Sequence, residues 1–497
     1  MQICLRWLWL GILLSSCRNY YTVQFFAIND TYEIAPLSGG AVGGMARVAT
    51  VYKREKAKQP NTFFVHAGDF LSPSVLSTLR FEGKRIAGRH MVEAMNTMGV
   101  QYATFGNHEF DLEEHDLIDR IQESNFQWIT TNILHRKDSA LQPFFQRGTP
   151  LPTSVILQID KLRIGILAVS IPVKKPFITF KDIYQSAQAE YAQLASQCDA
   201  VIALTHLELQ QDKELARRLP GLALIIGGHE HHHIYHRVGK TIIAKADANA
   251  KTAYIHRLKV SPKNKKCKVV SRLIAIRSSI EEDSATAAVV NRWQSIARAN
   301  LQQLGFQPDE MVAFASTPWN GMEKYVRNQP TNLSQLIAKA LWYAVPDADA
   351  AIINAGAIRI DDYLEGNITQ YDIMRILPFG GKLVSLHVKG GLLKEVLQTG
   401  RNNKGTGGYL ISEGIQQQAS GKWFIGGKPL QEEAIYHIVT TDFLASGKEF
   451  NLEFFNPRND QISNLHIFDD PSDVRSDIRH TLIAYLKLMA TKNSTQH

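Results

Sequence analysis

Side chains that bind divalent metal ions follow a series of short apolar runs in the first half of the chain. Asp30 follows one run, in FFAINDTYE, and Asp69 follows another, in FFVHAGDF. Carboxylate, amide and imidazole groups together are ligands of ions such as Mn²⁺, Zn²⁺, Co²⁺ and Mg²⁺, and one carboxylate can be shared by two ions. The candidate ligands are Asp30, Asp69, Asn107, His206, His229 and His231.

Each of these positions also has a structural explanation. GD and GN pairs are common turns after a strand, and a single His at a strand end is usually a satisfied polar residue. Residues 229–233 could form a solvated loop. A residue that can bind metal follows several apolar runs in turn. Because such repetition rarely arises by chance, we favour a metal centre.

The string GNHEFD places His108 next to the candidate ligand Asn107 and three residues before Asp111. An imidazole held by a carboxylate can protonate a leaving alkoxide. A pair of metal ions activates water and neutralises the charge of a phosphoryl group. Together these residues predict hydrolysis at a metal centre, with His108 and Asp111 as an acid–base pair. The alternative is that His108 and Asp111 only cap the helix that follows.

Short buried strands that alternate with helices must position these side chains. Apolar runs at residues 21–28, 62–65, 103–105 and 201–204 predict the strands, and each is followed by a polar turn and a helix-like segment. In such α/β layers the ligand sites lie at the carboxyl ends of the strands. The predicted fold class is therefore α/β.

The pattern changes at residues 279–304, where apolar side chains recur three and four positions apart without a strand signal. This spacing predicts a helix that connects two domains. A chain of 497 residues is also too long for a single core. We therefore expect domains at residues 21–278 and 305–497.

The second half predicts another α/β region. Strands are expected at residues 350–353 and 383–388, and helices at residues 332–344 and 473–489.

The composition is that of a globular protein, with 44% hydrophobic and 21% charged residues. The net charge of +8 is spread along the chain, with only short clusters such as residues 263–268, which indicates anionic ligands such as phosphate rather than nucleic acid. The four cysteines form no CxxC pair, and this argues against a structural zinc module or a disulfide framework. The oligomeric state is left open.

Residues 1–20 predict export. Arg6 precedes an apolar run at residues 7–14, and small residues then lead to Cys17, as in a short signal peptide. The LSSC string also resembles a bacterial lipoprotein cleavage box, in which Cys17 would carry lipid. The alternative is an uncleaved extension of a cytoplasmic protein. We favour a periplasmic or outer-membrane-anchored location, and no other stretch has the ~18 apolar residues of a membrane span.

In order and spacing, the strings GD, GNHEFD, THL and GGHxH resemble those of the calcineurin-like metallophosphoesterases, in particular the 5'-nucleotidase and UDP-sugar hydrolase branch. The resemblance extends over essentially the whole chain after the N-terminal segment. It implies a four-layer α/β/β/α metallophosphoesterase domain, joined by a helix to a smaller α/β substrate-binding domain. It assigns the acid–base roles to His108 and Asp111.

The resemblance also implies two divalent metal ions, with Asp69 shared between them. One site would be completed by Asn107, His206 and His229, and the other by Asp30 and His231. The family has a His two residues after the first Asp, where this chain has Tyr32. A tyrosine hydroxyl, with a pKa of about 10, is a poor ligand at neutral pH. The first site could therefore lack a ligand, use water, recruit Glu33 or prefer another metal.

Two arginines of the second half match substrate-binding residues of the family. Arg359, in IINAGAIRIDD, matches its GxxR element, and the alternative is a structural ion pair with Asp361 or Asp362. Arg327 matches an arginine that precedes a helix near the linker. Family members often carry a Glu where this chain has Pro330, so the phosphate clamp could differ.

The family stacks the base of its substrate between two aromatic rings. Phe379, in the PFG turn, matches the first ring, with a core position as the alternative. Phe450 is the nearest candidate for the second, because GKEF replaces the family string GGDG in this chain, and the register could shift by one.

The resemblance predicts release of phosphate from nucleoside 5'-monophosphates or related nucleotides. The alternatives on the same scaffold are a UDP-sugar hydrolase, a 2',3'-cyclic-nucleotide phosphodiesterase and a thiosulfohydrolase. A further alternative is a nucleotide-binding or surface-interaction protein with an impaired metal site, as Tyr32 would permit. The resemblance also implies a hinge, in which rotation about residues 279–304 would carry bound substrate to the metals.

Overall fold

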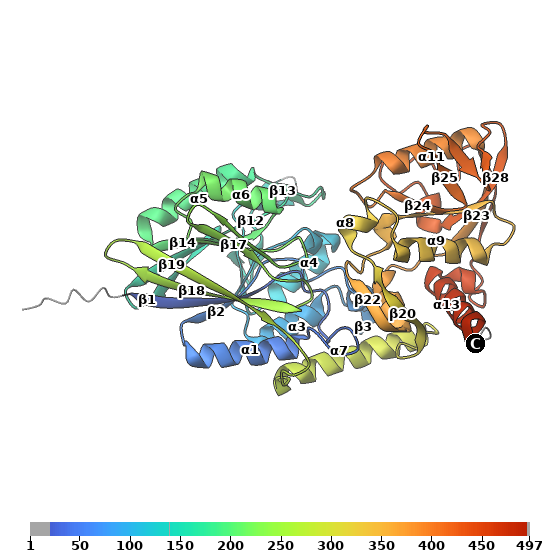
Figure 1. The fold of residues 1–497 in the computed structure, drawn as a ribbon. Coiled ribbons are helices and arrows are strands. Elements are labelled where there is room, and N and C mark those ends of the chain that lie inside the picture. The colour runs from blue at the N-terminus through green and yellow to red at the C-terminus, as the bar shows by residue number, and fades with distance from the viewer. Residues whose placement is uncertain (1–19, 139, 495–497) are drawn as a thin grey trace, which may run out of the picture.

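The computed structural model describes residues 20–138 and 140–494, which form two α/β domains joined by a long helix (Figure 1). The predicted signal or lipoprotein segment, with Cys17, lies outside the described residues. Within the described part of the chain, no helix is long and apolar enough to cross a membrane.

The first domain contains two six-stranded sheets that pack face to face. The first sheet has the order β19 (Lys266–Ala275), β18 (Thr252–Ser261), β1 (Tyr21–Ile28), β2 (Thr62–His66), β5 (Tyr102–Ala103) and β6 (Gln127–Trp128). The second has the order β11 (Ser154–Ile159), β12 (Leu162–Ser170), β14 (Ala200–His206), β15 (Leu224–Gly227), β17 (Thr241–Lys245) and β16 (Ile234–Val238).

Helices cover the outer face of each sheet. α1 (Met45–Lys58) and α3 (Arg89–Met98) pack on the first sheet, and α5 (Ile183–Gln197) and α6 (Leu209–Arg218) pack on the second. Side chains such as Phe25 and Ile164 fill the space between the sheets. The predicted α/β/β/α layering is therefore confirmed.

The central strands of both sheets run parallel. β1, β2 and β5 are parallel in the first sheet, as are β12, β14, β15 and β17 in the second. Their carboxyl ends therefore meet at one edge of the domain, where the polar side chains were expected. β14 extends further than the apolar run at residues 201–204 indicates, so that His206 is its last residue.

The connecting helix, α7 (Ser284–Gln303), packs against α1 and α3 and buries Trp293. It begins after Asp283, whose carboxylate caps it by accepting a hydrogen bond from the Thr286 backbone N–H. This N-cap explains why the helix starts five residues after the start of the patterned segment at residue 279.

The second domain has a five-stranded sheet with the order β24 (Leu410–Glu413), β21 (Ala350–Asn354), β28 (Ile435–Thr441), β23 (Leu383–Lys389) and β29 (Ile462–Ile467). A two-stranded sheet pairs β20 (Met311–Asn320) with β22 (Tyr363–Thr369). The larger helices are α9 (Asn332–Ala344), α11 (Gly390–Asn402) and α13 (Ile478–Ser494). The terminal helix begins later than predicted, because Val474–Ser476 forms a separate 3-10 turn, η3, capped by Asp473.

Shorter elements complete the chain. The helices are α2 (Val75–Thr78), η1 (His108–Asp111), α4 (Glu114–Glu123), α8 (Glu323–Val326), η2 (Ala355–Ala357), α10 (Gln370–Ile376) and α12 (Asp442–Ala445). The strands are β3 (Arg80–Phe81), β4 (Lys84–Arg85), β7 (Ile133–Lys137), β8 (Ala140–Gln142), β9 (Phe145–Gln146), β10 (Thr149–Pro150), β13 (Ile178–Phe180), β25 (Ile415–Gln417), β26 (Trp423–Ile425) and β27 (Lys428–Pro429).

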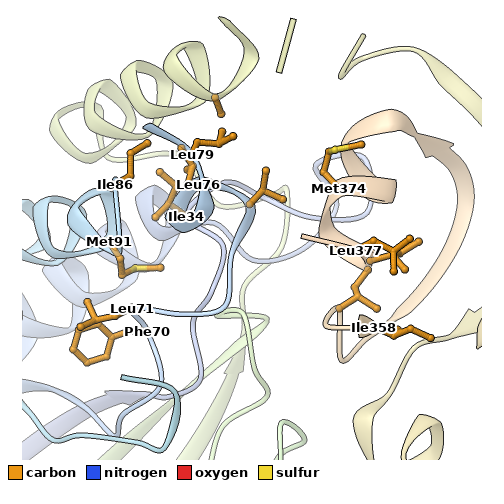
Figure 2. Close-up of a cluster of buried hydrophobic side chains, with 14 of the residues drawn as sticks. Ile34, Phe70, Leu71, Leu76, Leu79, Ile86, Met91, Ile358, Met374 and Leu377 are labelled. Carbon is orange, nitrogen blue, oxygen red and sulfur yellow. The ribbon is translucent and has the colours of Figure 1, made fainter. Parts of the chain in front are cut away.

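One apolar cluster continues from the first domain through α7 into the second. Figure 2 shows part of it, with Phe70 and Leu71 of the first domain and Met374 and Leu377 of the second. Next to this cluster, the domains also meet through charged side chains, such as the ion pair between Lys251 and Asp362. The hinge stays a prediction.

Candidate active site

The two carboxylates expected to bind metal lie at the ends of adjacent parallel strands. Asp30 follows β1 and Asp69 follows β2, and both side chains are fully buried. The Asp30 backbone N–H donates to the Gly68 carbonyl at 3.0 Å, which ties the two loops together. Burial raises the pKa of Asp30, but the charges of His231 and His206 lower it by more, to about 2. The carboxylate is therefore ionised, as a metal ligand must be.

His206 approaches both carboxylates from the second sheet. Its Nε2 atom lies 3.1 Å from Asp69 Oδ2 and 3.8 Å from Asp30 Oδ1. Nδ1 donates to the Ala67 carbonyl at 2.8 Å, which leaves Nε2 to face the carboxylates. This buried nitrogen has no hydrogen-bond partner within the described residues. A buried polar atom without a partner among acidic ligands fits a metal ion.

The remaining ligand candidates complete the cluster. Asn107 Oδ1 lies 3.1 Å from His229 Nδ1, although the two residues are far apart in the sequence. One ligand atom from each of Asp30, Asp69 and His231 lies within 4.8 Å of the others. The structure therefore brings all the predicted metal-binding side chains to one edge of the two sheets.

Tyr32 lies among the side chains expected to hold the first ion. Its hydroxyl donates to Asp69 Oδ2 at 3.3 Å and lies 3.0 Å from His231 Nε2. Burial, together with the negative charges of Asp69 and Asp30, raises its pKa well above the ordinary value, so the phenol is neutral. Glu33 does not join these side chains, because its carboxylate accepts a hydrogen bond from Tyr371 at 3.2 Å.

The two residues expected to act as an acid–base pair, His108 and Asp111, are in direct contact. His108 Nδ1 donates to Asp111 Oδ2 at 2.7 Å, and the His108 backbone N–H donates to Asp69 Oδ1 at 2.7 Å. Burial lowers the pKa of His108, but Asp111 and Asp69 raise it by more, so that it lies above its ordinary value. Both residues lie within η1, whereas α4 begins after Glu113, so neither side chain caps that helix.

Glu109, in the same string, has a structural role that the sequence analysis missed. One carboxylate oxygen accepts hydrogen bonds from the backbone N–H groups of Asp69 at 2.8 Å and Gly106 at 2.5 Å. The other accepts from Phe70 at 2.7 Å and Leu71 at 3.1 Å. The side chain therefore ties together the two loops that carry Asp69 and Asn107. Its only sequence signal is its place inside the GNHEFD string, between His108 and Phe110.

A buried ion cluster holds the loop that carries His229 and His231, and it was also missed. Lys245 Nζ lies 2.8 Å from Asp212 Oδ2 and 2.5 Å from Glu230 Oε2. Burial lowers the pKa of Lys245, but the two carboxylates raise it by more. The sequence signal was a lysine at the end of the apolar run TIIAK.

A cavity of about 390 Å³ opens between the domains at these side chains. The first domain contributes Asp69, Asn107, His108, His229 and His231 to its lining, and the second contributes Lys324, Arg327 and Asp361. Such a mixed cationic and anionic lining suits a metal-bound phosphoester.

Arg359 reaches the acid–base pair from the second domain. Its Nη2 atom lies 3.2 Å from His108 Nδ1 and donates to Asp111 Oδ2 at 3.4 Å. The alternative ion pairs of Arg359 are not formed, because Asp361 contacts His231 and Asp362 contacts Lys251.

The two candidate stacking rings lie elsewhere on the second domain. Phe379 and Phe450 are 57% and 60% exposed, and neither is among the side chains that line the cavity. The guanidinium of Arg359 lies 5.8 Å from the centre of the Phe379 ring. The turn before Phe450 is held by Glu449, whose carboxylate accepts a hydrogen bond from the Asn354 amide at 2.6 Å. A base held by these rings would therefore lie outside the metal cavity in this arrangement.

Two family models match the chain. Residues 23–233 match the calcineurin-like phosphoesterases, and residues 311–455 match the 5'-nucleotidase C-terminal domain. The 5'-nucleotidase of Mus musculus is 28% identical over 420 residues, which cover 75% of this chain and 69% of that protein. A snake venom 5'-nucleotidase of Naja atra is 26% identical over 465 residues, which cover 82% of this chain and 84% of that protein.

Solved structures show the same two-domain fold. The 5'-nucleotidase precursor of Thermus thermophilus superposes with a TM-score of 0.70 at 22% identity, over 94% of this chain and 97% of that one. The sulfate thiohydrolase SoxB, also of T. thermophilus, superposes with a TM-score of 0.66 at 16% identity, over 94% of each chain. Both family models, the relatives and the clustered ligands agree: this chain belongs to the divalent-metal-dependent calcineurin-like phosphoesterases that carry a 5'-nucleotidase C-terminal domain.

Proposed function

We propose that this protein is a metal-dependent phosphatase that hydrolyses nucleoside 5'-monophosphates or closely related nucleotides. The observation that carries the proposal is that three groups lie next to one another: the cluster of candidate metal ligands, the His108–Asp111 pair, and Arg359 of the second domain, which contacts that pair. Asp69, His108 and His231 of these groups line the cavity between the domains. The names of the relatives support a nucleotide as the substrate.

The ligand set divides between two ions that share Asp69. One ion would be held by Asn107, His206 and His229, and the other by Asp30 and His231. When bound, divalent ions lower the pKa of water and neutralise charge on a phosphoryl group.

The His108–Asp111 pair provides the proton for the leaving group. Because Nδ1 of His108 donates to Asp111, the other ring nitrogen, Nε2, can carry the proton that the leaving alkoxide needs. Burial lowers the pKa of the imidazole, but Asp111 and Asp69 raise it by more, which favours the protonated form that a general acid needs. Arg359, beside the pair, would hold the phosphoryl group in place, and Arg327, which lines the cavity, would neutralise charge there.

Catalysis and substrate binding would lie on different domains, with the domain boundaries that the sequence indicates. Residues 21–278 would perform the chemistry, residues 305–497 would select the substrate, and residues 279–304 would link them. The base would stack on Phe379 and Phe450, and a domain rotation would carry the nucleotide to the metals.

A set of substrates that represents the alternative activities on this scaffold tests the proposal. Chelator-treated protein is reloaded with Mn²⁺, Co²⁺ or Zn²⁺ and given AMP, UDP-glucose, 2',3'-cyclic AMP and bis-p-nitrophenyl phosphate. We expect AMP to release phosphate fastest, and no release without metal. Faster turnover of UDP-glucose or the cyclic nucleotide would reassign the substrate. No turnover of any substrate with any metal would overturn the enzyme and favour a binding protein.

We further propose that the protein is exported to the periplasm or anchored by lipid at Cys17. The apolar segment before Cys17 supports export, as do relatives that are named snake venom enzymes or a precursor. Cell fractionation and incorporation of labelled palmitate test this, with Cys17→Ser as the control. Protein found only in the cytoplasm and without label would contradict it.

A further inference from the structure

Asp361, in the second domain, contacts a metal-ligand candidate of the first. Its carboxylate pairs with Nδ1 of His231, and the pair is shielded from solvent, with side-chain exposures of 12% and 9%. The other carboxylate oxygen accepts a hydrogen bond from the Glu323 backbone N–H at 2.5 Å. Asp361 also has a φ of 41°, a left-handed conformation that non-glycine residues rarely adopt. The loop therefore holds this carboxylate against the imidazole at some conformational cost.

The contact decides which nitrogen of His231 is available to a metal. With Nδ1 paired with Asp361, the nitrogen that faces the candidate ligands is Nε2, which lies 3.5 Å from Asp30 Oδ1 and 3.0 Å from the Tyr32 hydroxyl. A carboxylate that accepts a hydrogen bond from one ring nitrogen fixes the tautomer and the orientation of the ring, and makes the other nitrogen a better ligand.

The other histidine candidates are oriented within the first domain. His206 Nδ1 donates to the Ala67 carbonyl, and His229 Nδ1 lies 3.1 Å from Asn107 Oδ1. Of the three histidines in the cluster, His231 is thus the one held by the second domain. His231 also belongs to the site in which Tyr32 stands where the family has a histidine. This site therefore has one candidate ligand fewer than the family pattern, and it depends more on His231.

We propose that Asp361 is a positioning residue through which the second domain completes the first metal site. The affinity of the ion held by Asp30, Asp69 and His231 then depends on contact between the domains, whereas the affinity of the other ion does not. By thermodynamic linkage, binding of that ion favours the domain arrangement that forms the contact. The inference rests on the metal ligands of the proposed function, and it adds a coupling between metal loading and domain position.

The test measures metal binding without turnover. Apo full-length protein is titrated with Zn²⁺ against a chromophoric chelator, and with Mn²⁺ by electron paramagnetic resonance. In Asp361→Ala, we expect the affinity of one ion to fall by about 10- to 100-fold, the range for the loss of a group that orients a metal ligand. The other ion keeps its affinity, and the Mn²⁺ spectrum changes from a coupled pair to an isolated ion.

Asp361→Asn separates positioning from folding of the loop. The two carboxylate oxygens of Asp361 face these two groups separately, Oδ1 the Glu323 N–H and Oδ2 His231 Nδ1. The single amide oxygen of Asn can accept from only one of them, and the side chain carries no charge, but it keeps the size of the carboxylate, so we expect a smaller loss of affinity at the same ion than in Asp361→Ala. His231→Ala should weaken the same ion, and Asp361→Ala should then have no further effect in that background. An additional loss in the double variant would overturn the positioning role.

Asp362→Asn is the matched control at the next residue. It weakens the contacts with Lys251 and Arg375 at the same domain interface and leaves the His231 contact in place. We expect both ions to bind as in the wild type. Equal losses in the Asp361 and Asp362 variants, or wild-type binding in Asp361→Ala, would overturn the inference. A wild-type protein that binds no divalent ion would instead overturn the metal site of the proposed function, and the inference with it.

Discussion

Four candidate metal ligands have left-handed backbone conformations. The φ angles are 51° at Asp30, 60° at Asp69, 97° at His229 and 62° at His231. Such conformations cost on the order of 1–3 kcal/mol each in residues other than glycine and persist only where the surroundings enforce them. Glu109 is one enforcing group, because it binds four backbone N–H groups next to Asp69 and Asn107. The polar site is therefore built at the expense of local backbone stability.

His108→Ala should lower kcat for AMP by a factor of about 10² to 10⁴, the usual contribution of one acid–base group. Metal content should stay unchanged, because the ring does not belong to the ligand set. Phosphate release and elemental analysis of the same preparation measure both. Asp111→Asn, which keeps a hydrogen-bond acceptor for His108, should cost less. Full activity in His108→Ala would refute the acid–base assignment.

Tyr32→His should strengthen binding of the first ion, because it restores an imidazole where a neutral phenol now contacts Asp69 and His231. Zn²⁺ titration of the apo protein measures the affinity of each ion. Tyr32→Phe is the control, because it removes the hydroxyl without supplying a ligand. If Tyr32→Phe abolished binding of that ion, the tyrosine itself would be a ligand, and the prediction would fail.

At the scale of the elements, parallel strands bring the candidate ligands together, and buried ion pairs hold the loops that carry them. Lys245, the last residue of β17, is fully buried between Asp212 of α6 and Glu230. Removing one partner of a buried ion pair leaves an uncompensated charge in a medium of low polarity. The loop with His229 and His231 should therefore depend on Lys245 for its position.

Lys245→Met should lower the free energy of unfolding by about 3–5 kcal/mol, because it leaves two carboxylates buried without their cation. Chemical denaturation followed by circular dichroism measures the change. Lys240→Met, at an exposed lysine just before the same strand, should stay within about 0.5 kcal/mol of the wild type. Similar values for both variants would show that the buried cluster does not stabilise the domain.

His256, in β18, should make the protein sensitive to acid. Burial lowers its pKa from 6.5 to about 3, so the folded protein keeps it neutral while the unfolded chain binds a proton below pH 6.5. The stability that depends on the neutral ring is therefore complete above pH 6.5 and is lost as the pH falls towards 3. Between pH 7 and pH 5 this residue should cost about 2 kcal/mol.

His256→Phe should remove that part of the pH dependence. The ring keeps its volume next to Tyr254, with which the imidazole is stacked at 5.2 Å. Denaturation midpoints are compared between pH 7 and pH 5, so that any constant packing cost of the new ring cancels. Parallel pH profiles for the wild type and the variant would contradict the prediction.

At the scale of the whole molecule, two binding surfaces must cooperate. Arg359 already contacts the His108–Asp111 pair, whereas Phe379 and Phe450 are open to solvent and do not line the cavity. Under the proposed function, the metal cluster of the first domain would bind the phosphate and the rings of the second domain would bind the base, so the domains would have to move relative to each other to bind one nucleotide. The apolar cluster through α7 shows where such a movement would have to be accommodated.

Phe379→Ala should raise KM for AMP by roughly 5- to 150-fold, which corresponds to about 1–3 kcal/mol of base stacking. KM for bis-p-nitrophenyl phosphate should change much less, because that substrate has no nucleobase. Phe314→Ala, which removes another exposed ring of the second domain, is the matched control. Equal changes for both substrates would indicate a structural defect and refute the stacking role.

The sequence by itself determined the fold class and proposed most of the candidate site. Buried strands followed by polar turns indicated an α/β fold, and Asp30, Asp69 and the GNHEFD string could be named as candidates because polar residues at strand ends need only local order. The same local reasoning could not define the later start of α13, where Asp473 and the η3 turn intervene.

Only the tertiary structure decided how distant side chains meet. It placed Tyr32 between Asp69 and His231, directed Glu33 to Tyr371 instead of the metal cluster, and brought Asp361 from the second domain to His231. These contacts join residues from different loops and domains, and their geometry depends on how the sheets and domains pack. No local pattern encodes that packing, because each contact is favourable only after the rest of the fold has removed its partners from water.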